Sequence, residues 1–563
     1  PLTFLFSCGD GTFEHKKDQV LAHFKNDTLK QQAANFLIEN AKGLKSIDSL
    51  SLKKNKPFFE YLEELARISE LDEDGRLKTG KRKPDEYIYR KGLDSIIKQQ
   101  IVSGKMQLPN YIEDSSSISS KAIIENIDNA FWAWKNFPWS RDVSFETFKE
   151  YILPYRVIDT YSLESRAIFL DQYKNLLPKQ MDISKAADSI REDIHLWFKE
   201  DGTLSSLYPF LFPMTFSEIY KSRIGTCYEA TALRISIMRS VGIPAAFEII
   251  PHWGNVNTNH FFYRVIDGSN NHRPLIDNKN IYRDTRDIIP GSSYTEKLVN
   301  PPKDYQIIYN KTVPKVFRKG FAINKNSLKY LLGSKEVLPA FFDDDRLTDV
   351  TSDYLETATV NVNLLDTLSS KSTVLYLAVF DPTGWQPVDW TIINGKTAKF
   401  TQVGKNILYL PCYYTKSGVL AAGEPFLLNN DGNLNFFSGA SKTQTLELER
   451  KFRLSSHNIG NALESVGIRI QGANKSDLSD TVNLYKIDNM TTKITEAHVK
   501  HKKKFRYIIC NFGGLKKATL AELELWGTAN GKGLLLKGKT SGNQGIYKKS
   551  ISEIFDKDRN TYY

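Results

Sequence analysis

The sequence predicts a multidomain protein of mixed α and β structure, and three observations support this class. The chain has 563 residues, several times the roughly 150 residues typical of one domain. Its front half carries apolar residues at helical spacing, whereas from about residue 346 short apolar segments alternate with Gly, Asn and Asp. Hydrophobic residues make up 41% and charged residues 25%, which is typical of globular proteins with large cores. We therefore expect a helical N-terminal region, an α+β core and antiparallel β-sandwich domains.

Helical periodicity is clearest near the start of the chain, in TLKQQAANFLIEN at residues 28–40. The apolar side chains that share one face of this segment are Leu29, Ala33, Phe36 and Leu37. Thr28 and Gln31 fit a capping box at its start. Similar patterns predict helices in KPFFEYLEELARI at 56–68 and in KAIIENIDNAFWAWKNFPW at 121–139.

The back of the chain is predicted to be β-rich. In residues 372–414, STVLYLAVFDPTGWQPVDWTIINGKTAKFTQVGKNILYLPCYY, short apolar alternations are separated by turn residues. Asn394 and Gly395 form a typical hairpin turn signal. This spacing predicts an antiparallel sandwich over residues 346–435, and a second β-rich stretch follows from about residue 440.

The net charge of +11 does not point to a nucleic-acid-binding protein, because Lys and Arg are interspersed with Asp and Glu. The densest basic run is HVKHKKKF at residues 498–505, just before a strand-like segment. We interpret it as a solvated loop, with nucleic-acid binding as the less favoured alternative.

The four cysteines, Cys8, Cys227, Cys412 and Cys510, are too widely spread for a disulfide framework or a zinc site. We therefore expect no metal in the site. The first residues, PLTFLFSCGDG, resemble the end of a bacterial lipoprotein signal peptide, which implies that Cys8 is lipidated. The alternative is a short apolar strand with an incidental cysteine. No later stretch reaches the ~18 apolar residues of a membrane-spanning helix.

Cys227 lies in RIGTCYEATALRISIMRSVGIP, residues 223–244. Apolar residues follow it at helical spacing, and Gly242 with Pro244 ends the pattern, so the cysteine is expected in the first helical turn. The helix dipole and unpaired N–H groups there lower a thiol pKa, which favours nucleophilic chemistry. The alternative is an inert core residue, because free cysteines are usually buried.

Two predicted strands downstream supply partners for that thiol. HFFYRVI and RPLID flank the turn-forming DGSNN, so we expect a hairpin that places His260 opposite Asp277. Asp277 would then orient the imidazole. Asp267 falls in the turn and is the weaker candidate. His252 and His272 have no evident partner and are expected to be solvated.

GTCYEATALRISIMRSVGIPA, followed by NHFFYRV and PLIDNKN, resembles the transglutaminase-like core, a papain-related fold with a Cys-His-Asp triad. The resemblance covers about residues 125–320. It implies that Cys227 is the nucleophile, His260 the general base and acid, and Asp277 the residue that orients the histidine. FETFKEYILPYRV and HWGN are similar to bacterial transglutaminase-like lipoproteins in particular.

The sequence departs from that family directly after the histidine. Family members commonly have a small residue and a Trp there, whereas this chain has Phe261 and Phe262. The departure concerns the wall of the substrate cleft more than the triad. Trp253 or Trp139 is a candidate to line the cleft, with plain packing as the alternative, and the backbone N–H of Cys227 is the more general oxyanion donor.

IQGANKSDLSDTVNLYKI and KFRYIICNFGGLKKATLAELELWG resemble galactose-binding, discoidin-type β-sandwiches. ISEIFDKDRNTYY resembles the start of a second such domain. The resemblance implies that loops of these modules bind glycans, in some members beside a structural calcium ion. The alternative is that they are spacers that hold the enzyme away from the membrane.

These observations predict an exported, lipid-anchored thiol enzyme of the bacterial cell envelope that acts through a thioester without a cofactor. The expected substrates are peptides or glycopeptides, with hydrolysis favoured over transamidation. The alternative is an inactive, surface glycan-binding lipoprotein. The expected parts are a residual signal and linker (1–25), a helical region (26–124), the catalytic core (125–320), a linker (321–345), a β-sandwich (346–435), a galactose-binding-like sandwich (440–527) and a truncated second copy (528–563).

Overall fold

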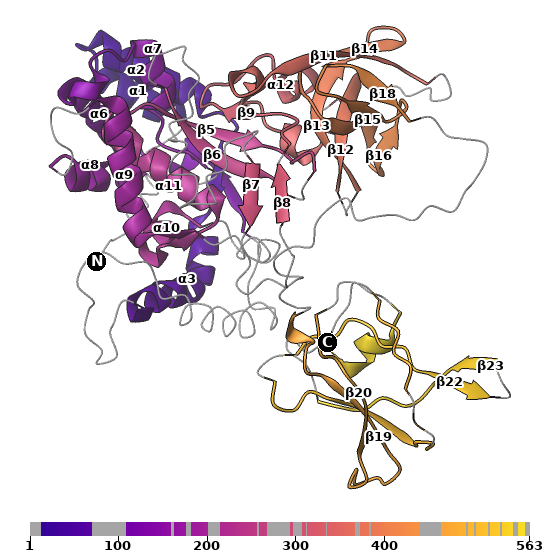
Figure 1. Ribbon diagram of the computed structural model, residues 1–563. Helices are drawn as coiled ribbons and strands as arrows, with labels where there is room; N and C mark the ends of the chain where they lie inside the picture. Colours follow the sequence, from indigo (N-terminus) through magenta and orange to yellow (C-terminus); the bar gives the residue numbers. More distant parts are fainter. Residues whose placement is uncertain are drawn as a thin grey trace. The chain divides into compact units, whose positions relative to one another are not determined.

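The computed structural model confirms the mixed α and β class (Figure 1). It describes residues 13–69, 109–158, 163–175, 182–200, 214–255, 258–266, 293–296, 307–310, 312–333, 335–365, 372–381, 384–437, 463–490, 494–499, 501, 503–515, 518–529, 532–543, 550–557 and 563. The chain divides into two compact units. The first is Pro1–Tyr294 with Asn310–Thr445, and the second is Thr295–Tyr309 with Leu446–Tyr563. The residue boundaries of the finer domains stay predictions.

The N-terminal part of the first unit is helical, as expected. Its elements are α1 (Phe13–His23), α2 (Thr28–Asn40), α3 (Ser49–Ser69), α5 (Asp114–Ser117), α6 (Ser120–Asn136), η2 (Pro138–Ser140) and α7 (Phe145–Tyr151), with β1 (Lys45–Ile47) paired to β2 (Tyr111–Glu113). The capping box predicted at Thr28 is wrong. Asp27 caps α2 by accepting from the Lys30 N–H at 3.1 Å, and Thr28 is already helical, because Asp is the stronger N-cap residue.

The α+β core surrounds one central helix, α11 (Cys227–Ser240). Around it lie α8 (Leu163–Tyr173), α9 (Ile183–Trp197), α10 (Phe216–Ser222) and the parallel pair of β3 (Lys199–Glu200) with β4 (Ile224–Gly225). An antiparallel sheet in the order β10-β9-β5-β6 completes the core, formed by β5 (Ala245–Ile250), β6 (His260–Val265), β9 (Phe317–Lys319) and β10 (Leu347–Asp349). A separate two-stranded sheet pairs β7 (Ser293–Glu296) with β8 (Ile307–Asn310).

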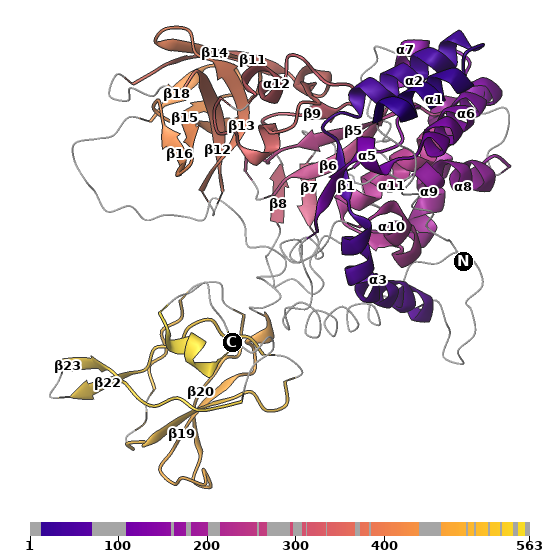
Figure 2. The same cartoon turned by 180° about the vertical axis from the view of Figure 1, so that it is seen from behind.

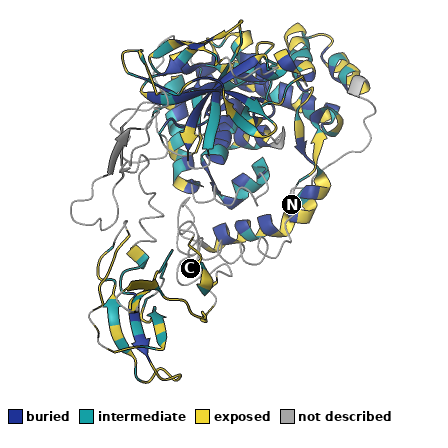
Figure 3. Ribbon diagram, turned by 90° about the vertical axis from the view of Figure 1, so that its right-hand side faces the viewer, coloured by how far each residue is buried: buried dark blue, intermediate teal, exposed yellow. Residues whose placement is uncertain are grey.

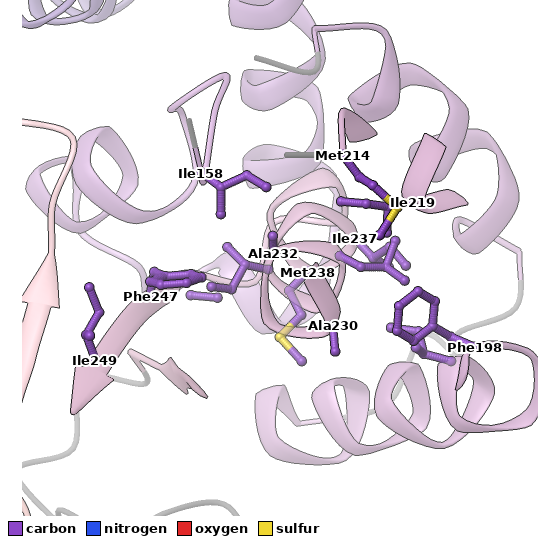
Figure 4. Packing of buried hydrophobic residues seen from close by; sticks show 14 of the residues in the cluster. Ile158, Phe198, Met214, Ile219, Ala230, Ala232, Ile237, Met238, Phe247 and Ile249 are labelled. Atoms are coloured by element: carbon purple, nitrogen blue, oxygen red, sulfur yellow. The ribbon is translucent and has the colours of Figure 1, made fainter. Parts of the chain in front are cut away.

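Alternation along β5 divides the apolar packing between the two faces of this sheet. Phe247 and Ile249 pack against α11, where Ala230, Ala232, Ile237 and Met238 supply the helix side of the cluster (Figure 4). Ile250 belongs to a second, smaller cluster with Trp253, Val313, Val316 and Val350. The two faces therefore have separate apolar cores, and α11 covers only the first.

The expected β-sandwich is formed by two antiparallel sheets (Figure 2). Its strands are β11 (Thr357–Asn363), β12 (Val374–Asp381), β13 (Gly384–Ile392), β14 (Thr397–Gly404), β15 (Ile407–Thr415), β16 (Gly418–Ala421), β17 (Phe426–Leu428) and β18 (Leu434–Phe436), preceded by α12 (Leu328–Leu332), η4 (Ala340–Phe342) and η5 (Thr351–Asp353). The predicted turn is confirmed: Asn394 pairs with Thr397, and Gly395 has a φ of +63°, which glycine adopts without strain.

The sandwich packs directly on the α+β core. β12 is buried along most of its length, and Figure 3 colours each described residue by its burial. Leu375, Leu377 and Val379 join the interior of the sandwich, whereas Val374, Tyr376 and Ala378 join the cluster around α11. The buried ammonium of Lys315 also lies 3.1 Å from a carboxylate oxygen of Asp389 on β13. Both sheets of the sandwich belong to the compact unit that carries Cys227.

The second unit is smaller and less buried. It contains β19 (Arg469–Ala473), β20 (Val482–Lys486), β21 (Tyr507–Asn511), β22 (Trp526–Ala529), β23 (Lys532–Leu535) and η7 (Ile551–Phe555), with a three-stranded sheet in the order β20-β19-β21. Leu520 and Tyr563 exchange backbone hydrogen bonds, and the N–H of Leu523 donates to Ile554 O at 2.8 Å. The described residues of the basic run 498–505 lie outside helices and strands and are largely exposed, which confirms the loop. Across all described residues, no helix is long and apolar enough to cross a membrane.

Candidate active site

Cys227 is the first residue of α11, as the sequence predicts. Thr226 is the N-cap, and its hydroxyl accepts from the Tyr228 N–H at 3.2 Å. The Glu229 carboxylate accepts from the Thr226 N–H at 2.8 Å and from its hydroxyl at 2.6 Å. This capping box fixes the start of the helix at the cysteine. At the other end Gly242, with a φ of +74°, turns the chain toward β5.

The thiol of Cys227 lies against the first residues of β6. The sulfur is half-buried and faces the backbone N–H of Phe261. One turn further along α11, the hydroxyl of Thr231 donates to the carbonyl of Phe261 at 3.2 Å. The helix therefore holds both polar backbone groups of the residue that directly follows His260. This contact brings the sulfur to the strand that carries the predicted base.

The expected low pKa of the Cys227 thiol is wrong. Burial raises the pKa to about 12, and the carboxylates of Glu200 and Glu229 add to the rise, although the Phe261 N–H lowers it. The helix N-terminus does not prevail, because the Glu229 carboxylate, which accepts from the Thr226 N–H, adds a negative charge at this end of the helix. At neutral pH the resting thiol is therefore protonated, and a base must remove its proton during attack.

The short parallel pair of β3 and β4 places Glu200 near the thiol of Cys227. The register pairs Glu200 on β3 with Gly225 on β4, two residues before Cys227. Its carboxylate forms a buried ion pair with Arg234 at 3.5 Å. Arg234 lies two turns along α11 from Cys227, so both project from the same side of the helix. Sequence reasoning missed this pair, because nothing in the local sequence links a Lys-Glu dipeptide to an arginine in a later helix.

His260 begins β6 and pairs with Ile250 of β5. Its ring stacks between Trp253, at a centroid distance of 5.7 Å, and Phe262, at 5.9 Å. Phe261 points to the opposite face, where its ring meets Tyr228 of α11 at 4.9 Å. The ring of His260 therefore lies on the sheet face that α11 does not cover, whereas the sulfur contacts the backbone N–H of the next residue, Phe261.

Trp253 and Trp139, the two candidates for lining the substrate cleft, lie in different parts of the core. Trp253 is buried to 1% exposure and contacts the imidazole face, so it supports the histidine and does not line an open cleft. Trp139 is buried, and its indole N–H donates to Val241 O at 2.8 Å. Val241 follows the last residue of α11, and the 14 residues of this helix span about 21 Å. The structure therefore does not bring Trp139 to Cys227, which corrects its expected place in the cleft.

The expectation that His252 is solvated is also wrong. Its side chain is buried, with Nε2 2.7 Å from Asp381 Oδ2 and Nδ1 2.7 Å from Trp253 O. The partner lies 129 residues away in β12, beyond the reach of local sequence patterns. Asp277, Asp267, His272 and the proposed lipid anchor Cys8 lie outside the described residues.

Comparisons with known proteins add no identity. No family model, curated protein or solved structure matches the chain. Among the residues that the structure describes, no group of three or more His, Cys, Asp or Glu side chains is placed to hold a metal ion. The chemistry of the site is therefore argued from Cys227, His260 and their surroundings.

Proposed function

We propose that this protein is a thiol acyl-transfer enzyme in which Cys227 attacks a peptide or carboxamide carbonyl. The observation that carries the proposal is the contact of the Cys227 sulfur, at the capped start of α11, with the amide that follows His260. Covalent acyl transfer needs a nucleophile and a base whose side chains come within hydrogen-bond reach, and this contact brings the sulfur to the strand that carries His260. The transglutaminase-like resemblance of the sequence supports the same assignment.

The raised thiol pKa favours general-base attack over a preformed thiolate–imidazolium pair. His260 accepts the Cys227 proton as the sulfur–carbon bond forms, and the resulting imidazolium protonates the leaving amine. Water or an amine then attacks the thioester, gives its proton to His260 and restores the free thiol. In the resting enzyme the ring of His260 stacks on Trp253. Asp277 is assigned the role of orienting that ring.

The proposed substrates are peptides or glycopeptides, with hydrolysis as the favoured outcome. Lipidation at Cys8 would hold the enzyme in the bacterial envelope. Glycan binding by the second unit, with or without a structural calcium ion, would attach the enzyme to glycan-bearing substrates. These assignments rest on the sequence resemblances described above.

A panel of peptidoglycan, glycopeptide and protein substrates tests the enzyme directly. The wild-type chain, Cys227→Ala and the matched control Cys510→Ala are incubated with each substrate, and released fragments are identified by mass spectrometry. Cys510 is a half-buried cysteine of the second unit, so its loss should leave the products unchanged. Identical products with and without Cys227 would refute the proposal.

The second candidate function is an inactive, glycan-binding surface lipoprotein. Two observations favour it: burial keeps the thiol protonated, and the His260 ring packs on the other sheet face. In that case Cys227→Ala should bind glycans as tightly as the wild-type chain and no substrate of the panel should be cleaved.

A further inference from the structure

The loop that joins β5 to β6 is held tightly beside the proposed base. The N–H of Trp253 donates to Thr258 O at 3.1 Å, and the N–H of Gly254 donates to Thr312 O at 2.9 Å. A Cβ at Gly254 would lie 2.7 Å from the Thr312 hydroxyl oxygen and 2.8 Å from Ile407 Cδ1 at the start of β15, so an added side chain would displace these groups. The loop is therefore pressed against the sandwich as well as against the core.

This loop is also linked to β12 by the hydrogen-bonded pair of His252 and Asp381. The two ring nitrogens face a backbone carbonyl, Trp253 O, and a carboxylate, Asp381 Oδ2, each at 2.7 Å. A carbonyl only accepts hydrogen bonds, and so does an ionised carboxylate. Both bonds form together when both ring nitrogens carry hydrogen, with Asp381 as the counter-ion. Both side chains are 10% exposed, so the pair is largely shielded from solvent.

This pair is connected to the proposed base through a single residue. His252 holds the carbonyl of Trp253, and the indole of Trp253 stacks on the ring of His260 at an interplanar angle of 28°. The packing of Trp253 against Ile250 and Val316 leaves the indole little freedom of its own. A change at Asp381, the last residue of β12, is therefore transmitted to the His260 ring.

We propose that Asp381 is a positioning residue of the acyl-transfer site, which it supports by fixing His252 and thereby the indole against His260. The inference rests on the proposed function for its catalytic meaning. The sheet that contains β12 would then have a role in the reaction, because its residue Asp381 holds the loop that supports His260. A purely stabilising ion pair would lower stability when broken but leave the ring of His260 unchanged.

Two variants separate these outcomes. Asp381→Ala removes the carboxylate, so His252 Nε2 loses its partner in β12. His252→Gln keeps a donor toward Asp381 and loses the donor to Trp253 O. Asp431→Ala, in the exposed turn between β17 and β18, is the matched control.

The experiment uses the full chain labelled at its histidine rings, with the His260 NMR signal assigned by its loss in His260→Gln. Turnover is measured on the substrate that the panel identifies. We expect both variants to shift or broaden the His260 signal and to lower kcat about tenfold or more, with KM changed by less than about twofold. Asp431→Ala should change none of these.

An unchanged His260 signal and kcat in folded Asp381→Ala would overturn the inference. If that variant does not fold, His252→Gln decides by the same comparison. Failure of the proposed function gives a different result: Cys227→Ala would then leave product formation unchanged. The NMR comparison would still decide whether Asp381 sets the orientation of the His260 ring.

Discussion

The Cys227 thiol differs most from the sequence expectation: the sequence predicts a lowered pKa, and the structure raises it. A pKa of about 12 lies about three pH units above the ordinary thiol value of 9.0. At pH 7 the resting thiolate fraction is therefore about 1,000-fold smaller than that of an ordinary exposed cysteine. Because alkylating reagents react with the thiolate, we expect iodoacetamide to label Cys227 more slowly than a free cysteine by about that factor.

The assay is the rate of Cys227 alkylation, followed by mass spectrometry from pH 6 to pH 10. The rate should rise about tenfold per pH unit without levelling off. Glu200→Gln removes a carboxylate that raises the thiol pKa, so this variant should be labelled faster than the wild-type chain at every pH. Fast labelling at pH 6, with a plateau above it, would show a preformed thiolate and refute the general-base mechanism.

Three further predictions concern the framework of the site. Thr231→Val removes the hydrogen bond to Phe261 O and should lower the free energy of unfolding by about 1 kcal/mol, measured by urea denaturation. Gly242→Ala should lower the melting temperature, because a Cβ at this φ of +74° would lie 2.9 Å from Ala133 O. Burial raises the pKa of Glu218 from 4.5 to about 7, so its contribution to stability is fully present below pH 4.5 and is lost as the pH rises through 7. Glu218→Gln should remove about 3 kcal/mol of that pH dependence, measured as unfolding free energies at pH 4.5 and pH 8, and an unchanged difference would contradict the assignment.

The local parts of the site could be predicted from sequence because their signals are local. The start of α11 follows from Thr226 and Glu229 at capping-box spacing, and its end follows from Gly242 before Pro244. The error at Thr28 is of the same kind, since Asp27, one residue earlier, is the better cap.

The electrostatics of the site could not be predicted, because they depend on tertiary contacts. The thiol pKa is set by burial and by Glu200, which arrives from a separate strand. His252 finds its hydrogen-bond partner in β12, so nothing in the HWGN segment itself indicates the buried pair with Asp381. Strand alternation at His260 predicts which face the ring occupies only once β5 and β6 are known to pair. The place of Asp277 beside His260 stays a prediction.

The central claim is that Cys227 becomes acylated with His260 as its base. The most direct measurement is rapid acid quenching of the reaction, followed by mass spectrometry of the peptide that carries Cys227, in the wild-type chain and in His260→Ala. We expect a hydroxylamine-sensitive acyl group on Cys227 in the wild-type chain and none in the variant. Substrate turnover without any acyl group on Cys227, or equal acylation in both chains, would contradict the mechanism.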